Sequence, residues 1–294
     1  MGTSSSYGGP KGSSPLVPSW VAPISPVGSS PLPSAPPSDA TPPVVPGAVP
    51  SLAAVQPPLQ AQPDRNRFRG PRTSFSRFAK SGGSNGGSLG RAVARYVSHS
   101  SGGARRAAQK MGASRTSAAR LVGFLADVQS RGTREALRAL DLERLAGRPV
   151  EEIFVGLMEF VCPRGGSVDE GIARDAFIKT VEDLSDVGII DLDTLTPAQM
   201  QTVLELYATH AIEDRLCNEI GTKAIALPKD VKAVEATMDQ LRDFVRGSVS
   251  NSIERAQAAL TALTVDRVQA VIDSVYETAF AFLQAAGELA AGEA

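Results

Sequence analysis

The residue of this chain with the most distinctive chemistry is Gly2, which follows the initiator methionine. A small second residue allows Met1 to be removed, which leaves a free glycine α-amine. That amine has a pKa of about 8, so a useful fraction of it is an unprotonated nucleophile at neutral pH, and no Cβ hinders its attack. The sequence therefore predicts Gly2 as a modification site. An N-myristoylation pattern (Gly2 with Ser6) and an ordinary chain start remain as alternatives.

A second candidate site is a stretch in which cations alternate with phenylalanine rings. Cations suit phosphates and rings stack on bases, so this pattern is typical of nucleic-acid binding. It suits an acidic protein surface equally well, and the helical spacing of Phe75 and Phe78 also allows the rings to dock on a core. The predicted binding residues are Arg65, Arg67, Phe68, Arg69, Arg72, Phe75, Arg77, Phe78 and Lys80, followed by Arg105 and Arg106.

The chain offers little material for catalysis or metal binding, because it has only two histidines and two cysteines. His210 and Cys217 fall on one apolar helical face, but seven residues separate them by roughly 10 Å, too far to share one metal without other ligands. We interpret both as packed side chains. The paired acids Glu151/Glu152, Asp191/Asp193 and Glu213/Asp214 are interpreted as solvated faces. We expect no enzyme activity, no metal and no cofactor.

These candidates lie in three segments of unlike composition. Residues 1–63 contain 16 of the 21 prolines and predict a disordered Pro/Ser/Gly-rich tail. Residues 64–120 carry 13 Lys/Arg against one acid, whereas residues 121–294 carry 16 Lys/Arg against 29 Asp/Glu. The net charge of −1 is thus a cancellation between a basic segment with short helices and an acidic helical domain.

The foldable part of the chain is predicted to be an all-α helical bundle, since helical periodicity runs from residue 114 onward without alternating strand patterns. Ser167 with Glu170, and Thr196 with Gln199, have the spacing of capping boxes that begin helices. Three- and four-residue apolar steps persist over residues 230–286. We favour a break into a hairpin there, either near Gly247–Asn251 or at Thr264.

Targeting signals are not evident in the sequence. Prolines interrupt every apolar run near the N-terminus, and no stretch reaches the roughly 20 apolar residues that span a bilayer. Two cysteines form no disulfide framework. We expect no membrane association and a cytoplasmic location.

Several stretches resemble a known family. They are Met1 to Gly12, Phe68-Arg69-Gly70, Gly102-Gly103-Ala104-Arg105, Met111-Gly112, and Pro163 to Ala176 with its Gly-Gly-Ser-x-Asp-Glu helix start. This order is similar to that of the QatB family, the B component of the Qat anti-phage defence system. The resemblance implies a bacterial defence operon whose other products are an ATPase, a QueC-like enzyme and a TatD-like nuclease.

Together these features predict a non-catalytic scaffold or effector component of a defence complex. The resemblance implies a QueC-like partner that activates a deazaguanine carboxylate, and the Gly2 amine would be the nucleophile that receives it. The alternative is a basic adaptor that binds nucleic acid and delivers DNA to the partner nuclease.

Overall fold

The predicted all-α fold is confirmed by the computed structural model, which describes residues 66–221 and 230–292. No strand occurs in those two ranges, and none of their helices is both long and apolar enough to cross a membrane. The predicted tail, residues 1–63, lies outside the described residues.

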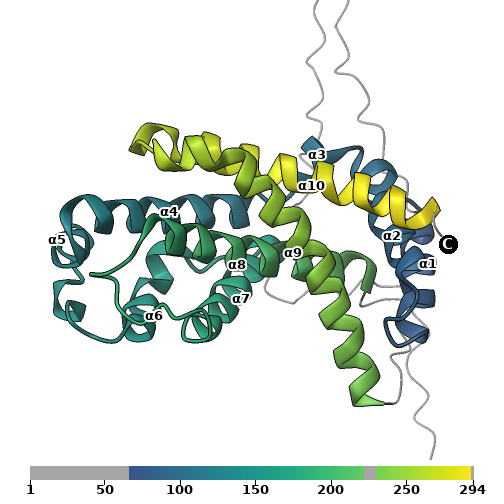
Figure 1. Cartoon of the computed structure of the whole chain (residues 1–294), viewed down its shortest axis with the longest axis horizontal. Helices are drawn as coiled ribbons and strands as arrows, with labels where there is room; N and C mark the ends of the chain where they lie inside the picture. Colours follow the sequence, from purple (N-terminus) through teal and green to yellow (C-terminus); the bar gives the residue numbers. More distant parts are fainter. Residues whose placement is uncertain (1–65, 222–229, 293–294) are drawn as a thin grey trace, which may run out of the picture. The chain divides into compact units, whose positions relative to one another are not determined.

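The described α-helices are labelled in Figure 1, and the shorter η segments lie between them. Their bounds are α1 Arg69–Lys80, α2 Gly86–Arg95, η1 Tyr96–Ser101, α3 Ala104–Gln109, α4 Gly112–Arg131, α5 Thr133–Arg138, η2 Glu143–Leu145, α6 Val150–Val161, α7 Val168–Asp183, α8 Pro197–Leu216, η3 Cys217–Gly221, α9 Val231–Thr261, η4 Val265–Arg267 and α10 Val268–Gly292. Two of these segments, η1 and η3, are π-helical, whereas η2 and η4 are single 3₁₀ turns.

Helix α8 lies at the centre of the acidic region and packs against α4, α7 and α9. Its apolar face is fully buried, with Val203, Tyr207 and Ile212 in one continuous core. Phe154 of α6 stacks on Phe177 of α7 with ring centroids 5.9 Å apart. This contact joins α6 to the same core.

Both predicted capping boxes are confirmed. The Ser167 hydroxyl accepts a hydrogen bond from the Glu170 amide at 3.2 Å, and the Glu170 carboxylate accepts one from the Ser167 amide at 2.8 Å. Thr196 and Gln199 make the same two contacts at the start of α8. These local bonds satisfy amide groups that have no partner within their helix.

The predicted break in the C-terminal apolar repeat is also confirmed, at the second of the two expected positions. Helix α9 continues through Gly247–Asn251 and ends at Thr261, and α10 begins at Val268 after the short η4 turn. The two helices then pack on each other, so each covers part of the other's apolar face.

The basic segment is not separate from the acidic helices, although composition suggested a boundary at residues 120–121. That position lies inside α4, and α10 packs against both α2 and α3. The apolar stripe of the α2 region, Leu89, Val93, Tyr96 and Val97, is buried in the common core. Burial of this stripe joins the basic and acidic regions into one compact unit within the described residues.

Candidate functional site

The predicted binding residues fall into three environments. Gly2 and Arg65 lie outside the described residues. Phe75 and Phe78 are completely buried and meet edge to face with centroids 5.7 Å apart, so their rings belong to the core and are not presented for stacking on a base. The exposed cations are Arg69, Arg77, Lys80, Arg105 and Arg106, and the half-buried residues are Arg67, Phe68 and Arg72.

The three half-buried residues form a stacked group with Tyr96. The guanidinium carbons of Arg67 and Arg72 lie 4.7 and 5.2 Å from the centroid of the Phe68 ring. Phe68 in turn stacks on Tyr96 at 6.3 Å. Contacts between cations and aromatic faces are attractive and restrict long side chains, so both arginines are held near the surface of this region.

The π-helical segment η1 connects this stacked group to α3. The Ser100 hydroxyl donates a hydrogen bond to the carbonyl oxygen of Arg67, and the Lys110 ammonium donates one to the Ser100 carbonyl oxygen at 3.2 Å. The Arg106 side chain lies against Gly102, where an added Cβ would be 3.1 Å from its Cδ and Nη1 atoms. Arg67, Arg106 and Lys110 therefore gather around one end of η1.

The second π-helical segment, η3, brings acidic and basic groups to the same place. Arg215 Nη2 lies 2.7 Å from Glu219 Oε1, and Arg215 Nη1 lies 3.6 Å from Asp169 Oδ1. Arg72 Nε donates a hydrogen bond to the Glu219 carbonyl oxygen at 2.9 Å. We call Arg67, Arg106, Lys110 and Arg215 the basic cluster. Its members come from three places in the sequence, and π-helical turns are frequent at functional sites.

The pKa values of Lys110 and Tyr96 are shifted by burial and by the charges gathered here. Burial lowers the pKa of Lys110, and the positive charges of Arg67, Arg215 and Arg106 lower it further, while Glu219 acts in the opposite direction. Burial also raises the pKa of Tyr96 well above its usual range, and the Glu219 carboxylate adds to that effect. Lys110 is thus a cation held among other cations.

Several buried polar atoms of this region have no hydrogen-bond partner among the described residues. They include the Tyr96 hydroxyl and Ser101 Oγ from η1, Arg215 Nε at the end of α8, and Glu219 Oε2 from η3. Tyr96 nevertheless interacts with Ser101, Glu219 and Arg215, so these groups form a buried polar network between η1 and η3.

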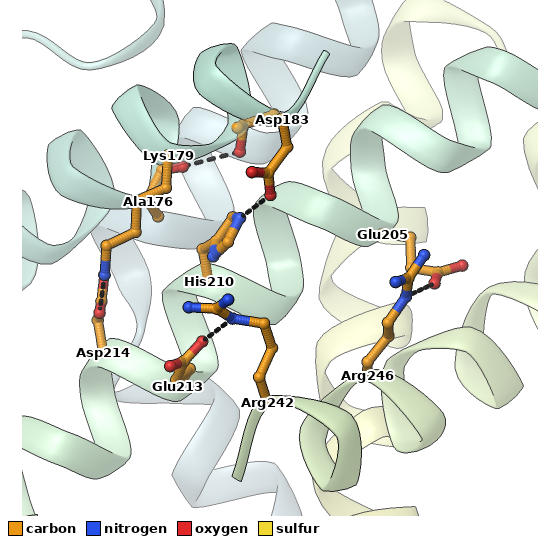
Figure 2. Close-up of polar contacts among 10 residues, drawn as sticks. Ala176, Lys179, Asp183, Glu205, His210, Glu213, Asp214, Arg242 and Arg246 are labelled. Carbon is orange, nitrogen blue, oxygen red and sulfur yellow. Dashed lines mark hydrogen bonds and ion pairs between the residues drawn. The ribbon is translucent and has the colours of Figure 1, made fainter. Parts of the chain in front are cut away.

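A different set of charges ties α7, α8 and α9 together, as Figure 2 shows. This polar seam consists of the ion pairs Lys179–Asp214, Arg242–Glu213 at 3.0 Å and Arg246–Glu205 at 2.9 Å, and of a hydrogen bond between His210 Nε2 and Asp183 Oδ2 at 2.8 Å. The interpretation of Glu213 as part of a solvated face is wrong, because its side chain is only 1% exposed. The packing of α9 over α8 covers Glu213, and Arg242 of α9 supplies the counter-charge.

His210 and Cys217 lie next to this seam and do not form a nucleophilic pair. The predicted burial of His210 is confirmed: its residue is 3% exposed, and its Nδ1 has no hydrogen-bond partner in the described part of the chain. Burial, followed by the charges of Glu213 and Asp214, raises the pKa of the half-buried Cys217 to about 12, so the group stays a thiol at neutral pH. The described residues contain no cluster of metal ligands either.

An apolar pocket of about 610 Å³ lies beside the C-terminal half of α4. Phe124, Ala136, Leu140, Phe160 and Leu263 contribute to its walls, with Arg120 and Asp127 among the polar lining residues. Its size is within the range of ligand pockets. The Asp127 carboxylate is already paired with Arg131, and Arg120 donates to the Phe160 carbonyl oxygen at 3.4 Å, so its polar groups have partners within the chain.

Sequence reasoning missed half of the basic cluster. Lys110 carries no aromatic neighbour to mark it, and Arg215 lies in an acidic stretch of sequence. Tyr96 and Glu219 were missed as well, because no local sequence pattern distinguishes either residue. Only the meeting of η1 with η3 shows that these residues belong together.

The fold and these charged groups define a class: an all-α protein in which basic helices are packed into an acidic helical unit. Comparison with curated proteins and with solved structures gave no match. The chain belongs to the QatB family, because residues 102–283, more than half of its length, match the family described as Qat anti-phage system associated protein QatB. It is therefore a component of the Qat anti-phage system, which implies partners within the same system.

Proposed function

We propose that the protein is a non-catalytic scaffold or effector component of the Qat system, and that Gly2 is the substrate of a QueC-like partner. The observation that carries the proposal is the unhindered Gly2 amine at the start of a proline-rich segment. Membership of the QatB family supports a role within a defence complex in the cytoplasm. The high pKa of the Cys217 thiol agrees with a non-catalytic role, since it disfavours the nucleophilic thiolate.

The proposed reaction is amide formation. The unprotonated Gly2 amine attacks the carbonyl carbon of the deazaguanine carboxylate that the partner has activated with ATP. The activating group leaves with the bonding electrons, and the attacking nitrogen loses a proton to solvent. The product carries the nucleobase in amide linkage on Gly2. The amine fraction that reacts rises with pH through its pKa of about 8.

Intact mass of the full chain, co-expressed with and without the QueC-like partner, tests this proposal. We expect an added mass on the N-terminal peptide only in the presence of the partner. Gly2→Ala places a methyl group beside the amine while still allowing removal of Met1, so it should reduce the modification. Gly8→Ala is the matched control and should leave it intact. Equal masses with and without the active partner would contradict the proposal.

A second candidate function is a nucleic-acid adaptor, and the exposed cations of α1–α3 favour it. Arg69, Arg77, Lys80 and Arg105 are exposed, and each phosphate contact releases counterions. Affinity for a duplex DNA should then fall steeply as the salt concentration rises. Binding that is insensitive to salt would instead indicate docking of the segment on a protein surface.

A further inference from the structure

We propose that the basic cluster, Arg67, Arg106, Lys110 and Arg215, binds a phosphoryl group. This site is distinct from Gly2 and does not depend on the modification of Gly2. The shared chemistry is a tetrahedral phosphoryl anion, which a free phosphate or a nucleotide supplies with about two negative charges and a phosphodiester of a nucleic acid with one.

The positive charges of the basic cluster outnumber the carboxylates that face it. The basic cluster has four cations, and the two carboxylates that face it are Glu219 and Asp169. Within the described part of the chain, two positive charges therefore remain uncompensated, even without Arg72, whose Nε donates a hydrogen bond to the Glu219 carbonyl oxygen. A phosphate monoester carries about two negative charges near neutral pH and would balance this excess.

The cations of the basic cluster are held in place before any ligand arrives. Lys110 is fixed by its bond to the Ser100 carbonyl oxygen, and Arg67 is stacked on Phe68. Arg215 is paired with Glu219, and its side chain is 12% exposed. Burial, followed by the positive charge of Arg67, lowers the pKa of Lys110, so a counter-ion at this place would favour its charged form. Preorganised cations of this kind lose little freedom when an anion binds.

The side chains of the basic cluster can donate many hydrogen bonds to an anion. Lys110 has three donors, and an arginine has five in a planar fork. The open acceptor Glu219 Oε2 would repel an anion. The phosphoryl group is therefore expected to contact Arg67, Arg106 and Lys110 on the side away from Glu219, while Arg215 offsets the charge of Glu219 beside it.

The distinction from nearby surface charge rests on adjacent arginines of α3. Arg105 and Arg106 are both exposed and carry the same charge, but only Arg106 lies against Gly102 and affects Lys110. Arg105→Gln and Arg106→Gln thus change the net charge equally. A difference in phosphate affinity between the two variants would therefore indicate a specific site and not a general attraction of a basic protein for anions.

Isothermal titration calorimetry of the full chain with inorganic phosphate, a 5′-mononucleotide and a short single-stranded DNA tests the proposal. We expect Arg106→Gln and Lys110→Gln each to weaken phosphate or nucleotide binding at least tenfold, in line with the loss of a charge-assisted hydrogen bond. Arg105→Gln should stay within twofold of the parent protein. Unchanged thermal unfolding of the variants would show that the fold is intact.

The three probes distinguish the source of the phosphoryl group. Binding of phosphate or the mononucleotide with this variant pattern assigns a small phosphorylated ligand, whereas the same pattern with DNA alone assigns a phosphate of a nucleic acid. Equal losses in Arg105→Gln and Arg106→Gln would overturn the proposal in favour of diffuse charge. Absence of binding to all three probes at millimolar concentration would overturn it as well. Neither outcome would alter the mass of the N-terminal peptide that contains Gly2, so this test and that of the proposed function are independent.

Discussion

Gly90 of α2 and Gly287 of α10 face each other where the two helices cross. A Cβ added to either residue would lie 2.7 Å from the carbonyl oxygen of the other, a distance that real Cβ atoms do not adopt. The absence of a side chain at both positions therefore allows the two backbones to touch. This contact joins the basic helices to the C-terminal helix of the acidic region.

The first prediction concerns this contact. Gly90→Ala and Gly287→Ala should each destabilise the protein by about 1–3 kcal/mol, because backbone atoms must move to accept the methyl group. Gly123→Ala in α4 is the matched control, since a Cβ there meets nothing within 4 Å. It should stabilise the protein by up to about 1 kcal/mol through helix propensity. Urea unfolding measures all three, and a stabilised Gly90→Ala would contradict the close approach.

The second prediction concerns the buried carboxylate of Glu213. Arg242→Met leaves that carboxylate without its partner and should lower the free energy of unfolding by about 3 kcal/mol. Arg246→Met, one turn further along α9, breaks a more exposed pair with Glu205 and should cost less than about 1 kcal/mol. Similar losses in both variants, measured by urea unfolding, would argue against the special burial of Glu213.

The third prediction uses the two capping boxes, of which only one can titrate. Hydrogen bonds from Ser167 lower the pKa of Glu170 below its ordinary value of 4.5. A carboxyl group whose pKa is lowered on folding contributes stability above its unfolded pKa and loses it as the pH falls through the folded pKa. Thr196 and Gln199 make the equivalent bonds without a titratable group.

Ser167→Ala and Thr196→Ala should each cost about 1 kcal/mol at pH 7. The cost of Ser167→Ala should shrink when the pH is lowered below 4.5, whereas that of Thr196→Ala should not change over the same range. Unfolding experiments at several pH values measure the difference. The pKa of Glu170, followed by NMR, should rise part of the way towards its ordinary value in Ser167→Ala, because the variant loses the hydroxyl bond and keeps that of the backbone amide. An unchanged pKa would contradict the contribution of the hydroxyl.

The fourth prediction concerns the cysteine thiols. Burial raises the pKa of Cys162, and burial with nearby acids raises that of Cys217 to about 12. Neither thiol should react quickly with a thiol reagent at pH 8, because the thiolate is the reactive form. Both should react once urea unfolds the chain, which provides the control. Rapid labelling of native Cys217 would indicate an activated thiol and would weaken the non-catalytic proposal.

Short-range features could be read from the sequence because their determinants lie within a few residues. Ser167 with Glu170 and Thr196 with Gln199 begin helices by contacts three residues apart, and the break before α10 follows from the local pattern around Thr264. The helical class follows from periodicity, and membership of the family agrees with the motifs of the sequence. The composition also separates the charges, since residue types are independent of folding.

Tertiary structure alone decided which charges meet. Phe75 and Phe78 have the sequence pattern of a binding segment but are buried, whereas Lys110 and Arg215 have no such pattern and come together at η1 and η3. Glu213 and Arg242 are 29 residues apart and form a pair because α9 crosses α8. Such meetings depend on crossing geometry, which small contacts such as that of Gly90 with Gly287 set between helices distant in sequence. Local propensity carries no information about these distances, so the basic cluster appears only once the helices are packed.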